Sequence, residues 1–138
     1  MDILLDVIEQ EFDFIGQLFV EFEQMMSYAR FFDTADNRRS LATLFYDFSE
    51  RLHQIAAAAL SGKNLKENKG VSPVFPEGLF CTETEEKLAV FFNFYEKFIN
   101  CYPYEIAYPE LKKLAVLFPE IVEMAAADLR RFLKNNGR

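Results

Sequence analysis

The sequence has very few of the residues that build metal sites and catalytic centres. Its 138 residues include one histidine, His53, two cysteines and no tryptophan. Glu50 and His53 have the Glu-x-x-His spacing of a di-iron ligand pair, but such sites need a second copy of the motif on another helix. A single histidine also leaves most zinc sites and catalytic triads incomplete. We therefore expect no metal site, no cofactor and no enzymatic activity, and we predict that His53 lies on the flank of a helix.

Glycine-rich loops and long apolar segments are also missing. The five glycines are scattered and form neither a phosphate-binding loop nor a dinucleotide fingerprint. The apolar runs are far shorter than the roughly 20 residues that span a bilayer, and no basic segment followed by an apolar one marks a secretory signal. We therefore expect a cytoplasmic protein without a membrane segment. Unpaired thiols suit that compartment, and Cys81 and Cys101 cannot pair because they bracket a predicted helix about 30 Å long.

Positive charge is absent from the first 29 residues. That segment holds seven acidic residues and no lysine or arginine, whereas residues 30–138 hold 15 acidic and 15 basic residues. The net charge of -7 therefore belongs to the first segment, and it disfavours nucleic acid as a partner because phosphates are repelled. The end of the chain is locally basic, so we expect a polarised molecule with one acidic element on a balanced body. The basic residues of that end are Arg130, Arg131, Lys134 and Arg138.

Apolar residues recur at steps of three and four along most of the chain, which is typical of amphipathic helices. The pattern predicts an all-α, single-domain bundle. The predicted helices cover residues 2–30, 37–60, 83–101, 109–118 and 119–134, with a long loop at 61–81. Thr82 and Glu85 form a capping-box pattern at the start of the third helix. Pro109 and Pro119 both suit a first helical turn, so the last two segments are either two helices or one kinked helix.

The acidic residues of the first helix lie opposite its apolar stripe. At about 100° per residue, Asp6 and Asp13 fall on the face opposite Ile8 and Ile15, whereas Glu11 falls inside the stripe and needs a partner or an opening there. A face that serves only solubility usually carries both signs of charge, so the lack of bases favours a binding surface. We predict that the partner contacts Asp2, Asp6, Glu9 and Asp13, then Glu21 and Glu23, with Tyr104 or Tyr108 as an aromatic anchor.

Aromatic residues are abundant, with 16 phenylalanines and six tyrosines. Most of the phenylalanines fall at core spacing, so we expect them to pack inside the bundle. Phe14, Phe94 and Tyr46 lie off the stripes. Such residues either anchor a protein interface or cover the long loop and the ends of the bundle.

In size, acidity, predicted helix content and lack of motifs, the chain resembles the bacterial toxin-immunity proteins, especially the helical ones of contact-dependent growth inhibition systems. The likeness transfers no site residues. It implies a protein that binds a nuclease toxin, an RNase in particular, and neutralises it by occluding its active site. Charge supports this, because a nuclease cleft is basic and a row of carboxylates is complementary to it. We expect a monomer or a weak dimer.

Two other functions stay open. The chain could be a helical adaptor, chaperone or homodimer that uses the stripe of the first helix as its seam, with Leu4, Ile8, Ile15, Phe22 and Met26 at the contact. It could also sequester an apolar ligand among its phenylalanines. The oligomeric state in solution separates the first alternative from the immunity hypothesis.

Overall fold

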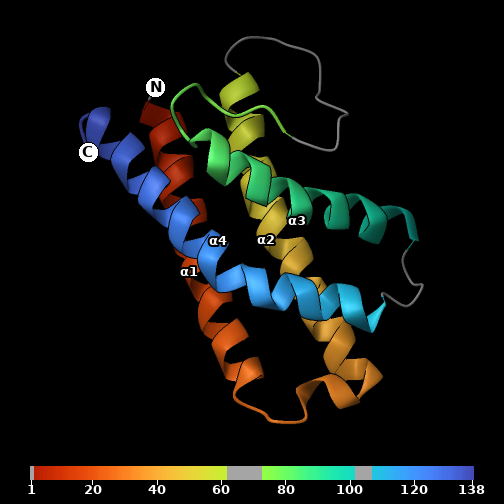
Figure 1. Ribbon diagram of the computed structural model, residues 1–138. Coiled ribbons are helices and arrows are strands. Elements are labelled where there is room, and N and C mark those ends of the chain that lie inside the picture. Colours follow the sequence, from red (N-terminus) through yellow and green to blue (C-terminus); the bar gives the residue numbers. More distant parts are fainter. Residues whose placement is uncertain (1, 62–72, 102–106) are drawn as a thin grey trace.

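Four α-helices form the chain in the computed structural model, which describes residues 2–61, 73–101 and 107–138 (Figure 1). The helices are α1 (Asp2–Met26), α2 (Ala35–Ser61), α3 (Thr82–Cys101) and α4 (Tyr108–Asn135), and a short 3-10 turn, η1 (Phe31–Asp33), joins the first two. No strand occurs within the described ranges. The prediction of an all-α, single-domain bundle is confirmed.

The helices pair in chain order. α1 and α2 form an antiparallel hairpin closed by η1, and α3 and α4 run in opposite directions across it (Figure 1). The second half of α4 lies beside the first half of α1, which brings the basic end of the chain next to the acidic helix. This pairing decides how much of the acidic surface is free.

The apolar stripe of α1 packs inside the chain's own bundle. Ile8, Ile15 and Phe22 are buried, and Leu4 and Met26 are half-buried against the same core. Burial of one stripe explains why this segment is helical, because the recurring apolar side chains gain most when they share one face. This stripe is therefore not free to form the homodimer seam that the sequence left open as an alternative, since α2 and α4 already cover it.

Phe118 of α4 lies at the centre of the aromatic core. Its ring centroid is 4.9 Å from that of Phe22 on α1, 5.1 Å from that of Phe48 on α2 and 5.9 Å from that of Phe91 on α3. Rings from all four helices thus meet at one side chain, and most of the phenylalanines serve packing as predicted. Phe94 was expected off the stripe, which is wrong: it is buried, in contact with the ring of Phe45.

Residues 108–135 form one helix rather than two. Pro119 lies inside α4, and the ribbon changes direction near the middle of this helix (Figure 1). Proline has no N–H for the helical hydrogen bond and its ring crowds the preceding turn, which is why helices bend there. Of the two arrangements that the sequence left open, the structure has the single bent helix. The adjacent Phe118 is held in the core, so tertiary packing supports α4 through the proline.

A carboxylate from α4 caps the start of α3. The backbone N–H of Cys81 donates to Oδ2 of Asp128 at 3.1 Å, and the buried Thr84 hydroxyl also bonds that side chain. Burial alone would raise the pKa of Asp128, but these two hydrogen bonds and the charge of Arg131 hold the pKa below its ordinary value. The helix begins at Thr82, one residue before the predicted start at residue 83. Thr82 is thus the first helical residue, and the cap is this tertiary contact with Asp128.

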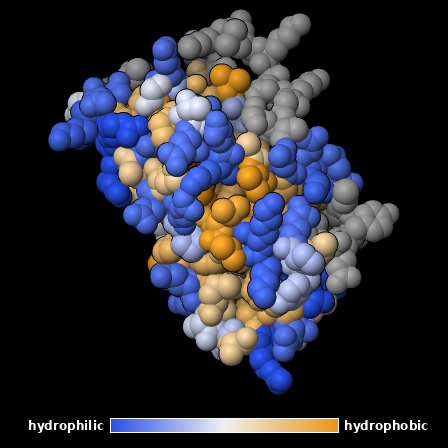
Figure 2. Space-filling model, in the orientation of Figure 1, coloured by the Kyte–Doolittle hydropathy of each residue, from blue (hydrophilic) through white to orange (hydrophobic). Residues whose placement is uncertain are grey.

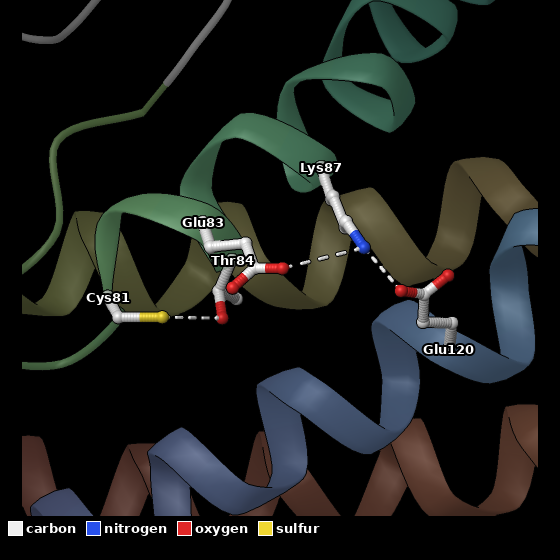
Figure 3. Close-up of polar contacts among 5 residues, drawn as sticks. All are labelled: Cys81, Glu83, Thr84, Lys87 and Glu120. Carbon is white, nitrogen blue, oxygen red and sulfur yellow. Dashed lines mark hydrogen bonds and ion pairs between the residues drawn. The ribbon is translucent and has the colours of Figure 1, made fainter.

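One further polar contact joins α3 and α4 near this cap. The ammonium of Lys87 bonds the carboxylate of Glu120 on α4 and lies 3.8 Å from Glu83 on its own helix (Figure 3). The hydrogen bond to Glu120 raises the pKa of Lys87 above its ordinary value. Beside this pair, the Cys81 thiol lies 3.2 Å from the Thr84 hydroxyl (Figure 3). The start of α3 is thus held to α4 by polar contacts, next to the phenylalanine core.

Candidate partner-binding surface on α1

The predicted acidic residues of α1 divide between two sides of the helix. Asp6, Asp13 and Glu21 are exposed on the side opposite the buried stripe. Glu9 and Glu23 lie toward the side of Phe12 and Phe19, which contact α4. We call the exposed side the outer face of α1; it consists of Ile3, Asp6, Gln10, Asp13, Phe14, Gln17 and Glu21. The side chain of Asp2 lies outside the described residues.

Arg138 binds two of the predicted partner-binding residues. Its guanidinium nitrogens lie 2.7 Å from Oδ1 of Asp6 and 2.7 Å from Oε1 of Glu9. The hydrogen bonds to Glu9 and Asp6 raise the pKa of Arg138 above its ordinary value. The basic end of the chain thus lies against the acidic helix, and the expected separation of charge between them is wrong at this point. The antiparallel packing of α1 and α4 is the reason.

The other acidic residues of α1 carry uncompensated charge. Within the described ranges, no side chain forms an ion pair or hydrogen bond with Asp13, Glu21 or Glu23. All three are exposed, and no lysine or arginine of α1 lies near them because α1 has none. The negative charge of the helix is therefore least compensated from Asp13 onward, away from Arg138.

Apolar side chains lie among these charges. On the outer face, 79% of Ile3 and 39% of Phe14 are exposed, and the neighbouring Val20 is 53% exposed. Gln10 and Gln17 occupy the positions before and after Phe14 on this face. Interfaces combine such an apolar and amide centre with a charged rim. The sequence indicated the acids and the position of Phe14, but not that these side chains share one exposed face.

Glu11, the carboxylate inside the apolar stripe, is buried and has a partner rather than an opening. Only 6% of the residue is exposed, and its Oε2 lies 3.2 Å from Nη1 of Arg51 on α2. Among the described residues, Oε2 accepts no hydrogen bond of good geometry, so the contact is chiefly electrostatic. Burial raises the pKa of Glu11 above its ordinary value, although the charge of Arg51 acts in the opposite direction.

Arg51 connects this buried carboxylate to the outer face. Its guanidinium carbon lies 5.3 Å from the centre of the Phe14 ring, within the range of a cation–π contact. Asp47 interacts electrostatically with the same guanidinium, and burial raises the pKa of Asp47 above its ordinary value. Arg51 was not predicted as a functional residue, since only the fold brings it between Glu11 and Phe14.

The single histidine makes contacts within α2 and with α3. Its Nδ1–H donates to the carbonyl of Ser49 at 2.7 Å, and its ring stacks on Tyr95 of α3 with centroids 4.3 Å apart. Tyr95 in turn stacks on Tyr46 and donates its hydroxyl to Glu50 at 2.6 Å. Burial and the bond to Glu50 raise the pKa of Tyr95 well above its ordinary value. These contacts join the outer sides of α2 and α3.

The predicted aromatic anchors do not join the acids at the first half of α1. Tyr108 is partly exposed at the start of α4, where its ring contacts Phe32 of η1 at 5.2 Å and Lys112 at 5.8 Å. That place is near the end of α1, about 30 Å along the helix from Asp6. Tyr104 lies outside the described residues. Of the predicted acids, only Glu21 and Glu23 lie toward the Tyr108 end.

The described part of the chain has neither a metal-binding cluster nor a helix suited to a membrane. No group of three or more histidine, cysteine, aspartate or glutamate side chains there is arranged to hold a metal ion. No helix there is long and apolar enough to cross a membrane. Cys81 is an exposed free thiol.

The chain was compared with models of protein families, with curated proteins and with solved structures, and none of them matches it.

Proposed function

We propose that the protein is a small inhibitor that binds a cationic protein through the outer face of α1. Asp13 and Glu21 supply charge without a partner of their own among the described residues, and Phe14 supplies exposed apolar area beside them. Charged groups arranged in this way steer a basic partner and raise the association rate at low salt. The single observation that carries the proposal is the exposed outer face, whose charged side chains are all acidic.

The partner that this surface suits best is a nuclease toxin, an RNase in particular. A nuclease cleft carries arginine and lysine because it binds phosphate, and a helix with spaced carboxylates can occupy it. The resemblance in size, acidity and helix content to toxin-immunity proteins supports the same proposal. Inhibition would follow from occlusion of the active site, with no chemistry required of this chain.

Association kinetics test the proposal. The partner is captured from an extract of the source organism on the immobilised wild-type protein and is then purified. Its RNase activity is measured with and without this chain. Charge reversal at Asp6, Glu9 and Asp13 is expected to slow association and to remove most of its salt dependence. The matched control reverses Glu85, Glu86 and Glu96, which are exposed on α3 and change the net charge equally. Equal effects of the two triple variants would contradict a specific role for α1.

A helical adaptor is the second candidate, because α4 also exposes apolar surface. Val116 is 75% exposed on the outer side of α4, and Figure 2 shows apolar surface in the middle of the face that α4 crosses. A second copy of the chain could cover it. Light scattering after size exclusion separates the candidates: a stable dimer that Val116→Asp dissociates supports the adaptor, whereas a monomer supports the inhibitor.

A further inference from the structure

We propose that Phe14 is the apolar anchor of the outer face of α1, and that the partner places a cationic amphipathic helix on it. The inference rests on the proposed function, because it names the partner's chemistry at the same surface. It goes further because it makes Phe14 the central contact. Glu11 and Arg51 then set the orientation of the Phe14 ring.

The outer face has the spacing that a second helix needs. Gln10, Phe14, Gln17 and Glu21 follow one another at steps of four, three and four residues, so they form one straight row along α1. A helix laid along another helix contacts residues at this spacing. Every member of the row is exposed, so the row offers a continuous surface more than two turns long.

The chemistry of this row changes from its centre to its edges. Phe14 is flanked along the row by the uncharged amides of Gln10 and Gln17, whereas Asp13 lies beside it and Glu21 at its end. Interface centres are depleted in charged residues, and their rims are polar. A complementary helix therefore carries an apolar side chain opposite Phe14 and arginine or lysine opposite Asp13 and Glu21.

The ring of Phe14 is held in place before any partner arrives. The Arg51 guanidinium lies 5.3 Å from the centre of the ring, and the buried Glu11 carboxylate holds Arg51 at 3.2 Å. An aromatic side chain that is already ordered loses less entropy when it is bound, and aromatic residues dominate the binding energy of interfaces. Glu11 and Arg51 are thus positioning residues, which gives a function to the one carboxylate inside the apolar stripe of α1.

Two synthetic peptides test the anchor directly. The first forms an amphipathic helix with arginines on one side and leucines on the other; the second has the same arginines but serine at every leucine position. Wild-type protein is expected to bind the leucine peptide more tightly. Phe14→Ala is expected to weaken binding of the leucine peptide by about tenfold and to leave the serine peptide unchanged. Ile99→Ala, on the exposed surface of α3, is the matched control and is expected to change neither affinity.

The location of binding is read from amide chemical shifts. Titration of the leucine peptide is expected to move the signals of Gln10, Phe14 and Gln17 most. Circular dichroism on each variant shows that the fold is kept. If Phe14→Ala binds the leucine peptide as tightly as wild type does, or if the largest shifts lie on another helix, the anchor assignment is overturned.

A separate pair of variants distinguishes the anchor from the proposed function. The double variant Asp13→Asn, Glu21→Gln is expected to weaken binding of both peptides and to reduce the salt dependence of that binding. If this double variant has its expected effect while Phe14→Ala has none, the acidic binding surface is supported and the role of Phe14 as anchor is overturned. If wild-type protein binds neither peptide in a salt-dependent way, the proposed function itself is contradicted.

The positioning role of Arg51 has its own readout. Arg51→Lys keeps the positive charge beside Glu11 but removes the planar guanidinium over Phe14. The substitution is expected to weaken binding of the leucine peptide several-fold and to leave the affinity for the serine peptide unchanged. An equal loss for both peptides would mean that Arg51 acts on the fold or the charge, and would overturn the positioning role.

Discussion

A guanidinium nitrogen of Arg138 lies 2.7 Å from the carboxylate of Asp6, where the last turn of α4 lies beside the first turns of α1. A second nitrogen of the same side chain binds Glu9. The chain thus supplies one arginine of its own to the acidic surface that it offers to a partner. A cationic partner must displace this arginine or bind further along α1, where Asp13 and Glu21 carry uncompensated charge.

Removal of Arg138 should therefore strengthen the attraction for cations. Arg138→Ala is expected to speed association with the leucine peptide about two- to fivefold at low salt, with the gain lost at high salt. Lys134→Ala is the control, because it removes the same charge from a side chain that contacts no acid of α1 among the described residues. Stopped-flow fluorescence measures both rates. If the two variants accelerate association equally, net charge alone is responsible.

The cap of α3 by Asp128 predicts a specific loss of stability. Asp128→Asn keeps the shape of the side chain but removes the charge that accepts from the Cys81 N–H, so the free energy of unfolding should fall by about 1–2 kcal/mol. The pKa of Asp128 is lowered in the folded state, so its contribution is complete above the ordinary value of 3.8 and is lost as pH falls through the lower folded pKa. Urea unfolding measures the change.

Glu123→Gln is the matched control for this prediction. Glu123 is exposed on the same helix and makes no ion pair or hydrogen bond within the described ranges. Its replacement should change the stability by less than about 0.5 kcal/mol. A similar, small effect at both positions would show that the bond between Asp128 and Cys81 does not stabilise α3.

The buried Glu11 predicts the opposite dependence on pH. Because its pKa is raised in the folded state, the folded protein binds this proton more tightly than the unfolded chain does. Its contribution to stability therefore falls as pH rises from the ordinary value of 4.5 through the higher folded pKa. Glu11→Gln, which mimics the protonated form, should match wild type below pH 4.5 and become relatively more stable above it.

Urea unfolding at pH values below and above 4.5 gives the difference in unfolding free energy between wild type and Glu11→Gln. The change of this difference with pH checks the direction of the Glu11 pKa shift. Subtraction removes most of the contribution of Asp47, whose pKa is raised in the same direction. If the variant becomes relatively less stable as pH rises, the attraction of Arg51 outweighs the cost of burial. The pKa of Glu11 would then be lowered rather than raised.

The core should depend strongly on Phe118. Phe118→Ala removes the ring that contacts α1, α2 and α3, and large-to-small changes at such sites cost about 3–5 kcal/mol. Val116→Ala, two residues away and exposed, should cost less than about 0.5 kcal/mol. Denaturant unfolding of both variants tests the contrast. A small loss for Phe118→Ala would contradict its central place in the core.

Local patterns were enough to predict the helices. The steps of three and four that bury Ile8, Ile15 and Phe22 are visible in the sequence, because one helix face must be apolar for a bundle to form. Pro119 was ambiguous for a physical reason: proline suits a first turn, and only the packing of Phe118 decides that α4 continues through it. A local motif cannot reveal this tertiary contribution.

The site was predictable only in part. The acids of α1 and the odd position of Glu11 follow from helical angles, but their partners lie far away in the chain. Arg51 and Arg138 meet α1 because α2 and α4 pack beside it, and no spacing in the sequence encodes these contacts. The same holds for Asp128, which caps a helix start 47 residues earlier.

The dependence of the association rate on ionic strength tests the central claim most directly. The measurement compares wild type with the variant reversed at Asp6, Glu9 and Asp13, and with the variant reversed at Glu85, Glu86 and Glu96, against the purified captured partner. The proposal predicts a steep fall of the wild-type rate with salt, which persists in the α3 variant and disappears in the α1 variant. A wild-type rate that is independent of salt, or an α1 variant that associates as fast as wild type, would contradict it.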